Sequence, residues 1–209
     1  MIDSAMRRVI DPPLNQMGQW LAARGATADG VTLIGLAVGL FAAGLIAVGV
    51  PLWLALIALL IGRLLDGLDG AVARATYKTD FGGYLDIVCD FVFYAAIPLA
   101  FVARDPSGNG LAGAFLLATF YVNGATFLGY AIMAEKRGMK TEAQGQKSLY
   151  YAAGLLEGTE TIAFFVLICL IPSLFVPAAW AFGTLCAVTA AARVWLARGV
   201  FFDLPSGRV

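Results

Sequence analysis

The sequence predicts an all-α integral membrane protein, with six transmembrane helices and an N-terminal amphipathic helix on the membrane surface. Of its 209 residues, 60% are hydrophobic and only 13% are charged, and the mean hydropathy is +0.82. This composition is typical of membrane proteins and not of soluble domains. The apolar residues also form runs of the length that a helix needs to cross a bilayer.

Composition excludes several classes of function. The chain contains no histidine, which excludes His-based triads, His-rich zinc sites and imidazole proton shuttles. The formal net charge is zero, and no basic stripe with interleaved aromatic residues indicates a nucleic-acid partner. The cysteines lie in apolar runs without metal-ligand spacing, so we interpret them as reduced core residues.

Residues 1–28 are predicted to form an amphipathic juxtamembrane segment. Their apolar residues recur at helical spacing opposite Arg7, Arg8 and Gln16, as in a helix that lies on a membrane surface. Pro12 and Pro13 are expected to break or kink this helix, and an unstructured tail is the alternative. The segment has no apolar stretch of the kind that signal peptides contain.

Residues 29–200 are predicted to form the membrane domain, and its first four spans follow from apolar runs. Residues 31–50 and residues 111–134 each supply an uncharged span. The run after Pro51 is too short to cross a bilayer alone, so the second span must continue to about Arg74. The third span then begins near Phe81 and ends near Ala103.

The last two spans share the uncharged stretch 161–192, which has 32 residues and is too long for one helix but too short for two. Pro172 and Pro177 divide it. The fifth span therefore starts near residue 149 and includes Glu157 and Glu160, and the sixth extends past Arg193 to about residue 199. Residues 201–209 remain as a C-terminal tail.

The distribution of basic residues predicts the orientation. Six spans place both termini on one side of the membrane, and nearly all Lys and Arg residues outside the spans lie on that side. The opposite side has only Arg104. By the positive-inside rule, we expect both termini to be cytoplasmic, with the polar residues embedded in the spans toward the same side. We expect the protein in the plasma (inner) membrane of a bacterium or archaeon.

Four carboxylates stand out because they lie within the second and third spans. Asp66 and Asp69 are three residues apart, and Asp86 and Asp90 are four apart, so each pair shares a helix face. The turn between the spans lies near residues 75–80. At 1.5 Å per residue, both pairs reach about 12–15 Å from the turn, so the two pairs are expected to face each other.

Converging carboxylates in a low dielectric need cations to neutralise them. Oxygen ligands without Cys or His suit Mg²⁺, Mn²⁺ or Ca²⁺, and two such ions between four acids would clamp phosphoryl oxygens. Nearby glycines allow a ligand to approach the backbone closely. Arg74, at the mouth of the predicted site, is suited to bind a phosphate.

The pattern Asp66-x2-Asp69-Gly70-x2-Ala73-Arg74-x7-Gly82-x3-Asp86-x3-Asp90 resembles the signature of the CDP-alcohol phosphotransferase family. The motif spans 25 residues, and the six-span layout is similar to that of the family over most of the chain. The stretch ATADGVTLIG, residues 26–35, resembles the opening of the family's first span. Many members have Pro-Asn there, where this chain has Ala28 and Asp29.

The resemblance implies that an alcohol hydroxyl attacks a CDP-linked donor and that CMP leaves. It implies two divalent ions, Mg²⁺ or Mn²⁺, held by Asp66, Asp69, Asp86 and Asp90, with Asp90 also acting as the general base. The CDP site that it implies comprises Asp66, Gly70, Ala73, Arg74 and Gly82. Family members often form homodimers. The expected donor is CDP-diacylglycerol and the expected acceptor is a small polar alcohol.

Other polar residues near the spans leave alternatives open. Arg63 either compensates the acids or binds a lipid phosphate. Asn123 either makes an interhelical hydrogen bond or lines the acceptor cavity. The basic residues Arg137, Lys140, Lys147 and Arg193 are candidates to bind a phosphate, and for the first two a solvated loop is the alternative. Glu157 and Glu160 either orient an acceptor amine or hydroxyl, or pair with Lys147 or Arg193. The glycines at 35, 39 and 44 are expected to pack helices, within the chain or in a dimer.

Two other functions fit less well. Within the same family, a CDP-choline or CDP-ethanolamine type of head-group transfer to diacylglycerol would use the same metal site. A cation transporter is a remote alternative, because its acids should be distributed across the bilayer. Here the acids gather at one end of their helices, beside glycines and an arginine suited to phosphate.

Overall fold

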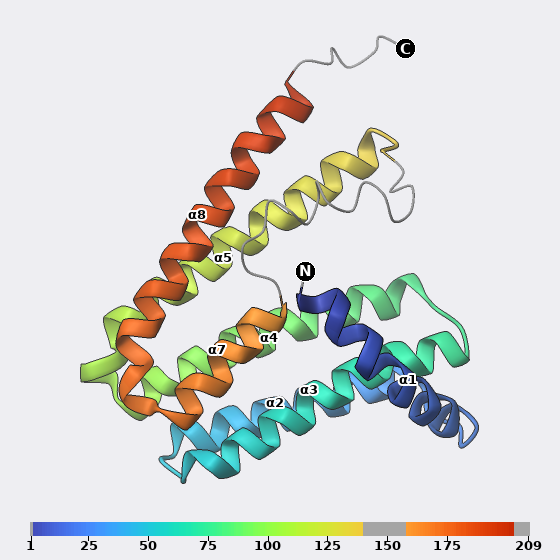
Figure 1. Ribbon diagram of the computed structural model, residues 1–209, viewed down its shortest axis with the longest axis horizontal. Helices are drawn as coiled ribbons and strands as arrows, with labels where there is room; N and C mark the ends of the chain where they lie inside the picture. Colours follow the sequence, from blue (N-terminus) through green and yellow to red (C-terminus); the bar gives the residue numbers. More distant parts are fainter. Residues whose placement is uncertain (1, 140–157, 203–209) are drawn as a thin grey trace.

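The computed structural model describes residues 2–139 and 158–202, and within these ranges the regular structure is helical (Figure 1). The element order along the chain is α1 (Ile2–Ala22), α2 (Ala28–Ala47), α3 (Leu52–Ala75), α4 (Asp80–Arg104), α5 (Pro106–Lys136), α7 (Gly158–Leu170), the 3-10 turn η1 (Pro172–Leu174) and α8 (Phe175–Phe201).

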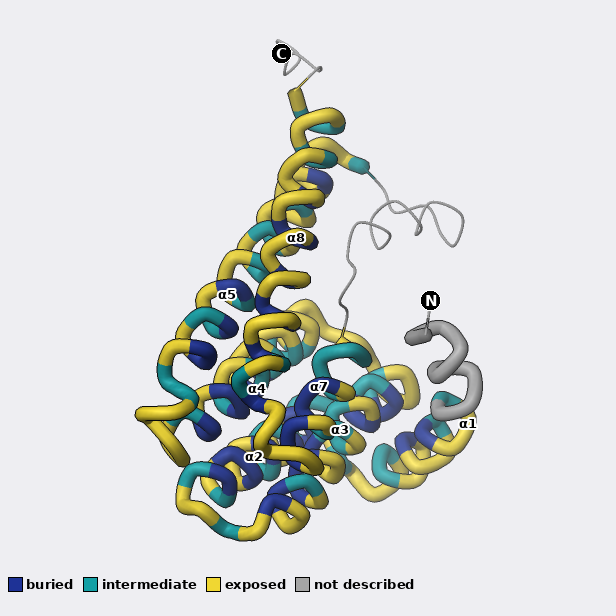
Figure 2. Tube along the Cα trace, turned by 60° about the vertical axis from the view of Figure 1, so that its left-hand side comes forward, coloured by how far each residue is buried: buried dark blue, intermediate teal, exposed yellow. Residues whose placement is uncertain are grey.

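The helices form two groups. In the first, α2 packs on both α3 and α4, α1 lies across the end of α3, and α7 contacts α3. In the second, α5 and α8 run side by side as a long pair, and they extend away from the other helices (Figures 1 and 2). The main apolar core joins the groups where they meet, around Phe93, Phe101, Phe165 and Phe175.

Four segments of the described chain are long and apolar enough to cross a membrane: α2, α4, α5, and η1 together with α8. Helix α3 is also long, with 24 residues, but Arg63, Asp66 and Asp69 lie within it. Helix α7 has 13 described residues, and the expected start of its span, near residue 149, lies outside the described residues. The count of six spans therefore stays a prediction.

The helix ends agree closely with the expected spans on either side of the predicted turn. Helix α3 ends at Ala75 and α4 begins at Asp80, where the Thr79 hydroxyl accepts a hydrogen bond from the Gly82 amide at 2.9 Å. Thr27 caps α2 in the same way through the Gly30 amide, at 3.2 Å. Such caps satisfy amides that have no partner inside the helix.

The fourth span begins earlier than the sequence predicted. The sequence predicted the span over residues 111–134, but α5 already starts at Pro106. Proline suits the first turn of a helix, and the Asp105 carboxylate accepts a hydrogen bond from the Gly108 amide at 3.0 Å. This bond, with a second from the Ser107 hydroxyl, lowers the pKa of Asp105. The cap and the proline thus outweigh the low helix propensity of the glycines and serine that follow.

Helix α1 continues through Pro12 and Pro13 without a break, so of the two expectations, a break or a kink, the break is wrong. Packing on α3 holds the part of α1 that follows the prolines. Leu14 is buried among residues of α2 and α3, and a Cβ added at Gly18 would lie 2.6 Å from the Cβ of Ala71. Only a glycine permits so close an approach of the two helices.

A second close approach joins α2 to α3. A Cβ at Gly62 would lie 3.2 Å from the carbonyl oxygen of Gly35 and 3.2 Å from the amide nitrogen of Gly39. A Cβ at Gly39 would also meet the Phe93 ring at 2.7 Å. Gly35 and Gly39 therefore pack helices within the chain, whereas a Cβ at Gly44 would meet nothing within 4 Å.

We expect Gly62→Ala to lower the free energy of unfolding by about 1–3 kcal/mol, because the new methyl group would press on backbone atoms of α2 that cannot move aside. Gly44→Ala is the matched control, and it should be neutral or stabilise the helix by up to about 1 kcal/mol. Thermal unfolding of the detergent-purified variants measures both. Equal melting temperatures for the two variants would contradict this close packing.

Candidate active site

Acidic residues of α3 and α4 lie close together where the two antiparallel helices face each other, away from the turn that joins them. One carboxylate oxygen from each of Asp66, Asp69 and Asp86 lies within 4.8 Å of the corresponding oxygens of the other two. Asp69 is buried, and the other two are partly buried. The structure thus brings together three of the four acids that the sequence singled out.

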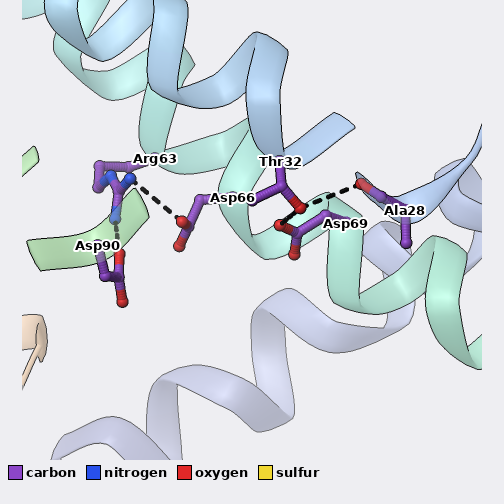
Figure 3. Close-up of polar contacts among 6 residues, drawn as sticks. All are labelled: Ala28, Thr32, Arg63, Asp66, Asp69 and Asp90. Carbon is purple, nitrogen blue, oxygen red and sulfur yellow. Dashed lines mark hydrogen bonds and ion pairs between the residues drawn. The ribbon is translucent and has the colours of Figure 1, made fainter. Parts of the chain in front are cut away.

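Thr32 on α2 orients one of these acids (Figure 3). Its hydroxyl lies 2.5 Å from Oδ2 of Asp69 and 3.1 Å from the carbonyl oxygen of Ala28. The buried hydroxyl therefore fixes the direction in which the Asp69 carboxylate points. Sequence reasoning did not predict Thr32. The signal that would have indicated it is a set of polar residues, Thr27, Asp29 and Thr32, at the start of an otherwise apolar run.

Arg63 holds the fourth acid (Figure 3). Its Nη1 donates to Oδ1 of Asp90 at 2.7 Å, and its Nη2 lies 3.1 Å from Oδ1 of Asp66. The guanidinium also lies over the Phe93 ring, 4.0 Å from its centroid. Of the two alternatives for Arg63, the structure shows charge compensation. Asp90 pairs with this cation and is not part of the three-acid cluster.

A cavity of about 470 Å³ opens beside the acidic cluster. It is lined by two of the acids, Asp69 and Asp86, and by four residues of the CDP site that the resemblance implied: Gly70, Ala73, Arg74 and Gly82. Asp66, the fifth residue of that site, does not line it. The remaining lining residues come from the start of α2 and the α3–α4 turn: Ala26, Thr27, Ala28, Asp29, Thr32, Thr76, Tyr77, Lys78, Thr79 and Gly83.

Arg74 brings positive charge to the wall of this cavity. Its Nε and Nη2 both donate to the side-chain oxygen of Asn15 on α1, at 3.2 and 2.9 Å. Its Nη1 lies on the other side, 3.3 Å from the position that a Cβ at Gly70 would take. Lys78 adds a second cation to the cavity wall. The cavity wall therefore combines carboxylates, Asp29 among them, with cations and glycines, as a bound diphosphate and its metal ions would require.

The expected acceptor residues are located elsewhere in the described structure. Arg193 on α8 is buried and donates through Nη1 to three oxygens of α5: the carbonyl oxygen and Oδ1 of Asn123, and Oγ1 of Thr126, at 2.9–3.0 Å. Asn123 thus makes the interhelical hydrogen bond that was one of its two alternatives. Lys147 and Glu157 lie outside the described residues.

Arg137 closes the far end of the α5–α8 pair. It donates to the carbonyl oxygens of Val200 and Phe201, at 2.9 and 2.6 Å. A cation at the C-terminus of a helix satisfies unpaired carbonyl groups and opposes the helix dipole. Like Asn123 and Arg193, Arg137 does not line the cavity beside the acids, so its role as a phosphate binder stays a prediction.

Comparison with known proteins supports the resemblance. A family model described as CDP-alcohol phosphatidyltransferase matches residues 26–200. The chain is 47% identical over 195 residues to the inner membrane protein YnjF of Escherichia coli K12, covering 93% of this chain and 94% of YnjF. It is 40% identical over 95 residues to archaetidylinositol phosphate synthase of Pyrococcus horikoshii, covering 45% of this chain and 50% of that protein.

The fold is also similar to that of a solved protein. The crystal structure of Mycobacterium tuberculosis phosphatidylinositol phosphate synthase (PgsA1) with CDP-DAG bound superposes with a TM-score of 0.72. The match covers 94% of this chain and 98% of the other, at 20% sequence identity. At this identity the likeness shows a common fold.

We expect Arg63→Gln to lower the free energy of unfolding by about 1–3 kcal/mol, because it leaves Asp66 and Asp90 without their shared cation. Adding Asp90→Asn should recover part of the loss. Thermal unfolding in EDTA, which removes divalent ions, measures this effect. The control is Arg24→Gln, since Arg24 is exposed in the turn that follows α1. A melting temperature for Arg63→Gln equal to that of the wild type would show that the cation does not stabilise the acids.

Proposed function

Because the chain belongs to the CDP-alcohol phosphatidyltransferase family, we propose that it transfers a phosphate-containing group from a CDP-linked lipid to the hydroxyl of a small polar alcohol. The observation that carries the proposal is the position of the acidic cluster. Asp69 and Asp86 stand at the wall of a cavity that Gly70, Ala73, Arg74 and Gly82 also line, as a CDP site beside a metal site requires.

The donor that we propose is CDP-diacylglycerol. A protein of the same fold has CDP-DAG bound in its crystal structure, and a chain embedded in the bilayer has direct access to a lipid-linked donor. The location that we propose is the bacterial inner membrane, supported by the apolar helices and by the name of the 47% identical relative.

The three-acid cluster fits a hard divalent cation. Its oxygens lie within 4.8 Å of one another, and opposite oxygens around an ion that binds at about 2.1–2.6 Å are separated by about 4.2–5.2 Å. Carboxylates without histidine or thiolate partners favour Mg²⁺ or Mn²⁺. We propose that Asp66, Asp69 and Asp86 hold these ions, two in number as in the family resemblance. When bound, the ions would neutralise charge on the diphosphate and on the departing CMP.

The residues of the chain supply the remaining steps. Arg74 and Lys78 bind the diphosphate, and Gly70 and Gly82 leave it room against the helix backbones. The alcohol oxygen forms a bond to the phosphorus on the lipid side of the diphosphate, and the bond from that phosphorus to the oxygen of CMP breaks. Asp90 accepts the proton of the alcohol. Arg63 holds Asp90 toward the deep side of the cluster, where an acceptor alcohol would meet it.

We expect the purified protein with Mg²⁺ or Mn²⁺ to release CMP from CDP-diacylglycerol in the presence of an acceptor, and EDTA to abolish this release. Asp90→Asn should lower kcat at least about 100-fold, since general bases contribute roughly 10²–10⁴-fold. The matched control is Asp80→Asn, on the exposed first turn of α4.

The substrate panel should include glycerol phosphate, inositol phosphate and serine as acceptors, and CDP-choline and CDP-ethanolamine with diacylglycerol. Turnover only with the last two donors would replace CDP-diacylglycerol by the head-group alternative. Turnover that survives Asp90→Asn would remove Asp90 from the role of base.

We also propose six spans, with both termini and the acidic cluster on the cytoplasmic side. A fluorescent protein fused after Val209 should then fold and fluoresce, and an alkaline phosphatase at that position should be inactive. The phosphatase fused after Asp105, between α4 and α5, should be active. The reverse pattern would place the acidic cluster on the outer face of the membrane.

A further inference from the structure

We propose that Asn15, on the surface helix α1, is a positioning residue for the donor: it holds the Arg74 guanidinium so that Nη1 points to the diphosphate. The inference rests on the proposed function, because it assigns a role in binding CDP. Asn15 precedes residues 26–200, the part of the chain that the family model matches. Neither the signature motif nor the cavity lining includes it.

The hydrogen bonds divide the guanidinium into two sides. Nε and Nη2 share the side-chain oxygen of Asn15, at 3.2 and 2.9 Å. Nη1 lies at Gly70, 3.3 Å from the position that a Cβ would take there, and both Gly70 and Arg74 line the cavity. One edge of the guanidinium, Nε with Nη2, thus binds Asn15, and Nη1 stays beside Gly70 at the cavity wall.

Arg74 needs such a partner because it lies on an exposed surface. A long exposed side chain samples many rotamers, and ordering it on binding a ligand has an entropic cost. A residue that orders the guanidinium beforehand removes part of that cost. Two donors to one oxygen also fix the plane of the guanidinium, which a single contact would not do.

The packing of α1 on α3 fixes where Asn15 lies. Leu14 lies against Gly67, with its Cδ1 3.2 Å from the position that a Cβ would take there. Gly18 lies against Ala71, since a Cβ at Gly18 would be 2.6 Å from the Cβ of Ala71. Gly67, Ala71 and Arg74 are spaced at four and three residues, so they share one face of α3. Two tight contacts on this face therefore place Asn15 next to Arg74.

The test is the affinity of the detergent-purified full chain for CDP, measured by titration calorimetry in Mg²⁺. Asn15→Leu removes the oxygen while it keeps the same branched arrangement of heavy atoms, and we expect it to weaken CDP binding about five- to tenfold, with an unchanged melting temperature in the absence of CDP. Gln16→Leu is the matched control on the exposed neighbouring position and should bind CDP as the wild type does. The KM for the acceptor should not change in either variant.

A double-mutant cycle shows whether Asn15 acts through Arg74. In an Arg74→Ala background, Asn15→Leu should weaken CDP binding no further, because the guanidinium that it positions is gone. An equal loss in both backgrounds, or wild-type affinity in Asn15→Leu, would overturn the inference. Asn15→Gln, which keeps a side-chain oxygen, should recover part of the affinity, and an equal loss in Gln and Leu would also overturn it.

The same measurements separate this inference from the proposed function. A wild-type chain that binds no CDP and releases no CMP from any donor contradicts the proposed function, and the role of Asn15 with it. A wild-type chain that does both, with Asn15→Leu indistinguishable from it, contradicts the role of Asn15 alone.

Discussion

The backbone of α2 lies against that of α3 at Gly35, Gly39 and Gly62, and the arrangement of the site depends on this contact. Without side chains between them, the two helices approach closely enough for Thr32 to reach Asp69 across the interface. The same approach brings the start of α2 over the α3–α4 turn, where it forms one wall of the cavity. The glycines that weaken these helices in isolation thus allow the polar contacts that make the site.

Charge is the second constraint, because four carboxylates within two largely apolar helices need compensation. The chain supplies part of it internally. Arg63 bridges Asp66 and Asp90, and its guanidinium lies over the Phe93 ring, so a cation and its acids are held between α3 and α4. The remaining acids, Asp69 and Asp86, face the cavity. Arg63 therefore compensates Asp66 and Asp90 from within the chain, whereas Asp69 and Asp86 lie at the cavity wall without an ion pair to it.

The parts of the structure that local sequence determines were predictable. Capping by Thr79 and the spacing of the aspartates follow from short-range rules, so the turn agrees with expectation, and three of the four acids expected to converge do so. Contacts between distant segments were not predictable in the same way. Asn15 meets Arg74 from 59 residues away, and Arg193 meets Asn123 from 70 residues away. Such pairs depend on which helix faces pack together, and the local patterns of one sequence carry little information on that.

The tie between α5 and α8 has a consequence for biosynthesis. Arg193 lies in α8, the last helix of the described chain, and three oxygens of α5 share its guanidinium. Helix α5 therefore enters the bilayer well before the group that satisfies its polar face is made. In a nascent chain that stops short of residue 193, that polar face of α5 stays toward lipid. Such a chain therefore differs from one that contains Arg193 in what it exposes within the bilayer.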